Sequence, residues 1–110
     1  MADPPRGLML NLASVDPDRE DEFNRWYEEE HLPDVRDRFP QITSARRYRA
    51  TDGREPRFLV VYEYDVGDED ELNALASAEN PLRRELWQMY DDAMGAFAHR
   101  SRRSFWQIYP

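Results

Sequence analysis

The run FLVVYEY, residues 58–64, limits the fold of this chain more than any other stretch of its sequence. Alternate side chains of an extended strand point to opposite faces, and in this run apolar residues fall on both faces. One face would carry Phe58, Val60, Tyr62 and Tyr64. The other would carry Leu59 and Val61. A sheet that contains this strand must therefore be covered on both sides.

The segments before this run predict a strand followed by a helix. Residues 7–14, GLMLNLAS, alternate in the manner of a buried strand. The following Asp16-Pro17-Asp18 is typical of a helix start, and we expect the helix to run to about His31. Because Pro33 has no N–H and crowds the residue before it, the helix should end near Leu32. We expect a short irregular or helical segment over residues 33–40, PDVRDRFP.

The remaining segments predict a hairpin, a second helical region and a last strand. Residues 42–50 and 57–65 are rich in β-formers and flank the turn-forming pair Asp52-Gly53. Residues 68–98 are helical in pattern, with a restart at Asn80-Pro81. Residues 104–109, SFWQIY, predict the last strand.

The order βαββαβ predicts an α+β, ferredoxin-like fold, a four-stranded antiparallel sheet with two helices on one face. These helices can cover only that face, although the strand at 58–64 is apolar on both. We therefore expect a second copy of the chain to cover the other face, in a homodimer.

Length and charge restrict the remaining possibilities. At 110 residues the chain suits a single domain, residues 1–110, of which we expect 1–6 to be flexible. A net charge of -8 argues against nucleic acid and anionic membranes as partners. The opening residues have neither a basic start nor a long apolar run, so a cytoplasmic protein is expected.

Cofactor and metal sites have no signature in the sequence. It contains neither a dinucleotide-binding nor a P-loop motif. Cysteine is absent and all fifteen cationic residues are arginine, which excludes thiol and lysine Schiff-base chemistry. The two histidines, His31 and His99, lie on different segments and form no three-ligand set, and we expect His99 at the surface in an Arg-flanked linker. We expect neither cofactor nor metal.

His31, in the stretch WYEEEHLPD, is the leading candidate for chemistry. On a helical wheel Glu30 falls near the centre of the apolar face and His31 at its edge, where a histidine reaches a cavity between helix and sheet. The helix end and the glutamates at 28–30 favour the imidazolium, so we expect the pKa of His31 above about 6.5. The alternatives are a partly exposed His31 that caps the helix, and a Glu30 that projects into water.

Aromatic residues are the second group of candidates for a functional site. They can line a pocket for a flat or apolar ligand, or they can fill the core or a dimer interface. The predicted substrate-binding residues are Asn11, Phe23, Tyr62, Trp87 and Tyr90. Adjacent Arg46 and Arg47 fall on opposite faces of their strand, so one of them must face a buried side. That arginine needs a partner, either Glu63 or an anionic ligand.

Three segments together resemble the dimeric α+β barrel superfamily, in particular its small EthD-like members. They are FNRWYEEEHLPD, SARRYRA and FLVVYEY. The W-Y-x-x-x-H-x-P helix of those proteins matches Trp26, Tyr27, His31 and Pro33, and the similar order of elements spans about residues 7–109. The resemblance implies two sheets packed face to face and a ligand cavity between the helices and the sheet of each subunit.

The superfamily includes cofactor-free monooxygenases, polyketide cyclases, lactone isomerases, lyases and haem-degrading enzymes, and the fold alone does not choose among them. Our leading hypothesis is a cofactor-independent enzyme of the isomerase, cyclase or lyase type that acts on a small hydrophobic or aromatic carbonyl compound. His31 would move the proton, and Tyr27 or Tyr62 would stabilise the enolate oxygen. The alternatives are a cofactor-free monooxygenase on phenolic substrates and a non-catalytic ligand-binding dimer.

Overall fold

The computed structural model describes residues 6–109 and contains one four-stranded sheet. Its strands are β1 (Gly7–Val15), β2 (Ile42–Arg49), β3 (Phe58–Tyr64) and β4 (Ala98–Trp106). They lie in the order β2-β3-β1-β4, and every pair of neighbours is antiparallel. The helices are α1 (Glu20–Trp26), α2 (Leu32–Arg38), α3 (Glu69–Ala76) and α4 (Pro81–Met94). The predicted ferredoxin-like fold is confirmed.

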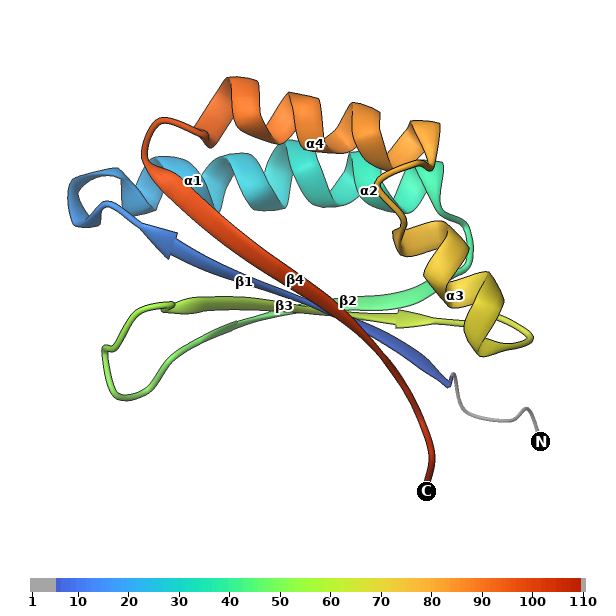
Figure 1. Ribbon diagram of the computed structural model, residues 1–110. Coiled ribbons are helices and arrows are strands. Elements are labelled where there is room, and N and C mark those ends of the chain that lie inside the picture. The colour runs from blue at the N-terminus through green and yellow to red at the C-terminus, as the bar shows by residue number, and fades with distance from the viewer. Residues whose placement is uncertain (1–5, 110) are drawn as a thin grey trace.

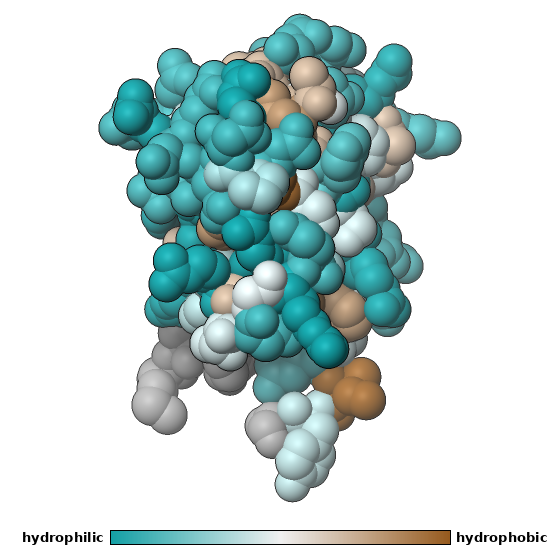
Figure 2. Space-filling model, turned by 90° about the vertical axis from the view of Figure 1, so that its left-hand side faces the viewer, coloured by the Kyte–Doolittle hydropathy of each residue, from teal (hydrophilic) through white to brown (hydrophobic). Residues whose placement is uncertain are grey.

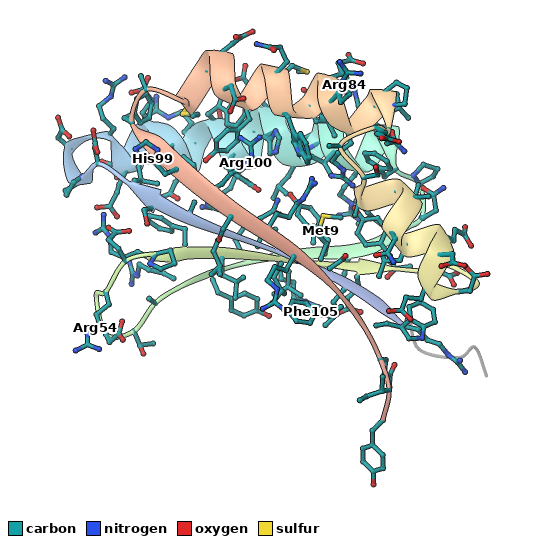
Figure 3. The ribbon with its side chains drawn as sticks, in the orientation of Figure 1. Met9, Arg54, Arg84, His99, Arg100 and Phe105 are labelled. Carbon is teal, nitrogen blue, oxygen red and sulfur yellow. The ribbon has the colours of Figure 1, made fainter. Side chains whose placement is uncertain are left out.

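All four helices lie over the same face of the sheet, with α1, α2 and α4 along it and α3 near one end (Figure 1). The core fills the space between the two layers. Met9 points from β1 toward the helices, whereas Phe105 of β4 lies on the opposite face (Figure 3). The largest fully buried side chains include Phe23, Phe39, Met9, Tyr62 and Tyr64.

The predicted break near Leu32 is wrong, whereas the helical alternative expected for residues 33–40 is found in α2. A π-helical turn, Tyr27–His31, joins α1 to α2, and the N–H of Leu32 donates to the carbonyl of Tyr27 five residues earlier. Pro33 then stands in the first turn of α2, where a missing N–H costs little. The wide turn therefore lets the chain continue as a helix past the proline.

The second helical region restarts where the sequence predicts. Asn80 caps α4, and its side-chain oxygen accepts hydrogen bonds from the N–H groups of Leu82 and Arg83. Asp68 caps α3 in the same way, through the N–H of Glu71. In the predicted hairpin turn, Gly53 has a φ of 71°, a conformation that glycine adopts at least cost.

The last strand was predicted too late. It occupies Ala98–Trp106 rather than residues 104–109, and it pairs with β1 along its whole length. Its arginine-rich first half lacks the β-branched residues that usually indicate a strand, so pairing with β1 rather than local propensity determines its start. Ile108 and Tyr109 lie beyond the strand and are exposed. His99 is exposed, but it belongs to β4 rather than to a linker.

The face of the sheet away from the helices carries a partly buried group of apolar side chains, with charged residues such as Arg46 and Arg103 among them. Its apolar residues are Leu8, Leu10, Leu12, Tyr48, Leu59, Val61 and Phe105. Within residues 6–109, no helix lies on this face (Figure 1). By contrast, the side of the molecule in Figure 2 is mainly hydrophilic, with apolar colour in small separate areas.

The predicted flexible segment, residues 1–6, lies outside the described residues except for Arg6, whose carbonyl accepts a hydrogen bond from the N–H of Gln107 at 2.8 Å. None of the helices in the described part of the chain is long and apolar enough to cross a membrane.

Candidate functional site

A cavity lies between the helices and the sheet, beside the π-helical turn. It contains about 310 Å³ of empty space, counted with the solvent at its mouth, and its enclosed part has room for about one water molecule. Six of the seven residues predicted for the site line this one cavity: Asn11, Tyr27, His31, Tyr62, Trp87 and Tyr90. They come from β1, the π-helical turn, β3 and α4.

His31 is buried at 6% exposure, so it is not the partly exposed capping residue of the alternative reading. Aromatic rings surround it rather than hydrogen-bonding partners. Its imidazole stacks on Trp26, with ring centroids 4.8 Å apart and an angle of 20° between the planes. Tyr27 and Tyr90 contact it through ring edges, with centroids at 4.8 Å and 5.8 Å. Nδ1 of His31 is buried and has no hydrogen-bond partner in the described structure.

The π-helical turn accounts for this placement. In a regular α-helix, residues three and four apart share a face, and a wheel therefore places Glu30 near the apolar centre. The wider turn inserts an extra residue before Leu32. As a result Tyr27 and His31 are buried, while Glu28, Glu29 and Glu30 are exposed. The alternative reading of Glu30, a side chain in water, is the correct one.

The pKa of His31 is lowered to about 4, so the predicted rise is wrong. Burial is the largest cause, and the positive charges of Arg100, Arg83 and Arg38 lower the pKa further. The glutamates that were expected to raise it point into solvent, where their effect is screened. His31 is therefore a neutral imidazole at pH 7.

We expect the free energy of unfolding to depend on the protonation of His31. Between about pH 6.5 and pH 4 the unfolded chain binds a proton at this residue and the folded chain does not, so stability falls as the pH falls. Each pKa unit corresponds to about 1.4 kcal/mol, which makes the loss at most about 3 kcal/mol. Urea denaturation at about pH 7 and pH 4.5 measures it.

Other groups also titrate between pH 7 and pH 4.5 and change the free energy of unfolding. The contribution of His31 is therefore found by comparing variants with the wild type. His31→Gln should lose less stability than the wild type over this interval, whereas His99→Gln, at an exposed position, should match the wild type. The same loss in all three proteins would contradict a neutral, buried His31.

Two hydroxyl groups and one amide group lie close together in the same cavity as His31. The hydroxyl oxygens of Tyr27 and Tyr62 lie 3.2 Å apart, and Nδ2 of Asn11 makes a long contact of 3.5 Å with the Tyr27 oxygen. Burial raises the pKa of Tyr62 well above its usual value and that of Tyr90 to about 12. These two phenols are protonated at neutral pH and can donate hydrogen bonds to an oxygen anion.

Three arginines complete the cavity, and none of them was predicted. Arg83 comes from α4, and Arg100 and Arg102 come from β4. Arg100 and Arg102 lie in the first half of β4, before residue 104, where the predicted strand begins. Ala98, Arg100 and Arg102 are spaced two residues apart, and alternate residues of a strand share a face. This spacing was the signal in the sequence that could have placed both arginines on the buried side. Burial lowers the pKa of Arg102 to about 10, with Arg83 and Arg100 adding to the effect.

Phe23 is the predicted residue that does not line the His31 cavity. It is a core residue at 1% exposure and borders a second hollow of about 240 Å³, solvent included, that shares Asn11, Tyr27, Tyr90 and Arg100 with the first.

Arg47, not Arg46, faces the helices. A bulge between Ile42 and Ser44 shifts the alternation of β2 by one residue. Arg47 then pairs with Glu28 at 2.9 Å and donates to the side-chain oxygen of Asn24 at 2.8 Å. The predicted partner Glu63 instead pairs with the exposed Arg46, at 2.9 Å.

No family model and no curated protein sequence matches this chain. Solved structures do match in fold. An EthD family protein from Bacillus halodurans C-125 is 15% identical, with a TM-score of 0.60 over 88% of this chain and 96% of that one. A dimeric ferredoxin-like protein from an uncultured marine organism is 15% identical, with a TM-score of 0.59 over 96% and 98%.

A proposed antibiotic biosynthesis monooxygenase from Nitrosomonas europaea is 19% identical, with a TM-score of 0.56 over 94% of this chain and 99% of that one. At such identities the likeness concerns the fold and not the reaction. This chain therefore has the ferredoxin-like fold that EthD-like and dimeric ferredoxin-like proteins share.

Proposed function

We propose that this protein is a cofactor-independent enzyme that moves a proton on a small carbonyl compound, in an isomerase, cyclase or lyase type of reaction. One observation supports this more than any other. A buried neutral imidazole and the hydroxyl groups of three tyrosines, Tyr27, Tyr62 and Tyr90, line the same cavity. A base next to hydrogen-bond donors is the arrangement that enolisation requires.

In this mechanism His31 accepts a proton from the carbon next to the carbonyl group. The electron pair of the broken C–H bond moves to the carbonyl oxygen, where hydroxyl groups such as those of Tyr27 and Tyr62 donate hydrogen bonds to the enolate. The imidazolium then returns the proton to another atom of the substrate. A base with a pKa of about 4 is weak, but the enolate charge beside it raises its basicity as the reaction proceeds.

The substrate class follows from the lining. Trp87 and Tyr90 are aromatic walls for a small hydrophobic or aromatic molecule. The enclosed part of the cavity has room for about one water molecule, so binding a ring must displace side chains at the mouth.

Exchange of substrate protons with solvent tests this proposal directly. Enolisable ketones and keto acids are incubated with the protein in D₂O, and loss of the proton signal next to the carbonyl is followed by NMR. Exchange faster than in buffer with an equal concentration of free imidazole supports the enzyme. Absence of exchange across the panel favours the ligand-binding dimer.

A cofactor-free monooxygenase on phenolic substrates is the second candidate, because the fold matches the proposed monooxygenase from Nitrosomonas europaea. An oxygen electrode separates the two reactions. Oxygen consumption with electron-rich phenols would favour this candidate, whereas proton exchange in the absence of oxygen favours the isomerase, cyclase or lyase type.

We further propose that the protein acts as a homodimer joined through the open face of its sheet. The partly buried leucines of β1 and the valine of β3 would be covered by a second copy, as apolar surface of this kind usually is. The dimeric ferredoxin-like neighbour supports this arrangement.

Leu10→Arg should break this dimer. Leu10 pairs across the sheet with Val61 and Arg103, so a new arginine would bring a second positive charge next to Arg103 in an apolar interface. Like charges in an interface cost several kcal/mol, on the order of 100-fold in the dissociation constant. Sedimentation velocity measures it. Leu82→Arg, on the exposed side of α4, is the matched control and should remain dimeric. A wild-type protein that sediments as a monomer would refute the proposal.

A further inference from the structure

The charge of the cavity is opposite to that of the whole molecule. The chain has 23 acidic and 15 basic residues, yet among the described residues that line the cavity there are three arginines and no aspartate or glutamate. Arg100 pairs with Asp91 at 2.9 Å. Within residues 6–109, Arg83 and Arg102 have no carboxylate group within 4 Å.

The contacts that these two arginines do make hold them in place without balancing their charge. Arg83 is 3% exposed and donates to the Tyr64 hydroxyl at 2.9 Å. Arg102 donates from Nη2 to the carbonyl of Ala76 at 2.7 Å and lies over the Trp87 ring at 4.1 Å. Every acceptor here is neutral. Buried charges in proteins are normally paired, and the cost of leaving the buried Arg83 and the partly buried Arg102 unpaired requires a reason.

Unpaired polar atoms gather at the same place. Among residues 6–109, seven buried side-chain nitrogen or oxygen atoms have no hydrogen-bond partner. Four of them belong to residues that line this cavity, namely Asn11 Oδ1, His31 Nδ1, Tyr90 Oη and Arg102 Nη1. Because more than nine in ten buried polar groups are usually satisfied, such a concentration indicates a ligand position. A water molecule would satisfy the hydrogen bonds but not the charge.

We propose that the cavity binds its ligand through a carboxylate group, with Arg102 Nη1 and the Tyr90 hydroxyl donating to the carboxylate oxygens. The positive charges of Arg83 and Arg100 stabilise the anion. The inference rests on the proposed function in taking this cavity as the substrate site. A carboxylate suits the site better than a phosphate does, because it is small, singly charged and planar like the edge of a guanidinium group. The substrate is then a carbonyl compound that also bears a carboxylate, such as a keto acid.

A bound carboxylate also changes the base. The arginines that lower the pKa of His31 would be partly neutralised by the anion, so the pKa of His31 should rise when the ligand binds. Binding of a carboxylate would thereby strengthen the base.

Equilibrium titration by NMR tests the site without requiring turnover. The probes are acetate and benzoate, with acetamide and benzamide as neutral molecules of the same shape. We expect saturable shifts of the His31 ring signals with the two carboxylates only, and a higher His31 pKa in their presence, while the exposed His99 serves as the internal reference. Equal binding of amide and carboxylate, or no saturable binding of either carboxylate, would overturn the inference.

Variants locate the contact. Arg102→Gln should weaken carboxylate binding roughly 10- to 100-fold, because it removes hydrogen bonds to a charged group. Arg102→Lys keeps the charge but loses the planar fork, and should also bind more weakly than the wild type. Arg84→Gln is the control: Arg84 points away from the sheet on α4, whereas Arg100 lies between helices and sheet (Figure 3). Circular dichroism shows whether each variant is folded. If Arg102→Gln does not fold, the affinity of Arg102→Lys for the carboxylates decides whether Arg102 binds them. Wild-type affinity in a folded Arg102 variant would refute the site.

The two proposals fail separately. Carboxylate binding without proton exchange on any substrate would support the anion site and refute the proposed enzymatic activity. Proton exchange on neutral ketones without carboxylate binding would keep the enzyme and refute the anion site.

Discussion

His31→Ala is expected to lower the rate of proton exchange on a carbonyl substrate by about 10²- to 10⁴-fold, the usual contribution of a general base. His31 lines the cavity as a neutral imidazole at pH 7, and its buried Nδ1 has no hydrogen-bond partner among the described residues, so it can accept a proton there. The residual rate would reflect binding and the hydroxyl donors alone. Deuterium exchange followed by NMR measures both rates.

The control for this variant is His99→Ala. His99 is the second histidine of the chain, it is exposed on β4, and it does not line the cavity. It should exchange protons at the wild-type rate. His31→Gln gives a second test, because it preserves much of the side-chain volume and retains no base. If His31→Ala and His31→Gln both keep the wild-type rate, another group moves the proton and the assignment is wrong.

Phe23→Ala should destabilise the protein by about 3–5 kcal/mol, the usual cost of removing a buried phenylalanine. Phe23 lies at the centre of an aromatic cluster, and its ring centroid is 5.4 Å from that of Tyr27, 5.7 Å from Phe58 and 6.4 Å from Tyr90. These neighbours come from α4, β3 and the π-helical turn, so the cavity left by alanine would loosen both layers at once. Denaturation in urea at pH 7 measures the change.

Leu82→Ala is the surface comparison, because Leu82 is 42% exposed on α4. Its effect should stay within about 0.5 kcal/mol plus the small change in helix propensity. Phe23 was predicted as a substrate-binding residue, and the two roles have different consequences. A Phe23→Ala protein of wild-type stability that lost only ligand affinity would contradict the core role that its burial indicates.

Local patterns in the sequence predict most of the architecture. The alternation in residues 7–14 and 58–64, the Asp-Gly turn and the Asn80-Pro81 restart each depend on residues close together in the chain. Such patterns determine which segments form strands and helices, and their order selects the ferredoxin-like topology. Trp26 and Tyr27 indicate the apolar side of their helix and so place His31 at the edge of that side, but not inside it.

The chemistry of the cavity was not predictable in the same way. The pKa of His31 is lowered first by burial and then by Arg100 and Arg83, which are more than fifty residues away in sequence, whereas the nearby glutamates predicted a raised pKa. Arg100 and Arg102 reach the cavity only because β4 pairs with β1, whereas Arg83 reaches it from α4. Side chains from distant segments act on a buried group only after folding removes the water between them.

The sequence by itself determined the order of the elements, the two apolar faces of the sheet and the aromatic side of the first helix. The tertiary structure decided three further features. The π-helical turn carries the helix past Pro33 and turns His31 inward, the bulge in β2 directs Arg47 rather than Arg46 toward the helices, and the pairing of β4 with β1 brings Arg100 and Arg102 into the cavity. Each of these is a shift of register by a residue or a turn, and register depends on packing between distant segments rather than on local propensity.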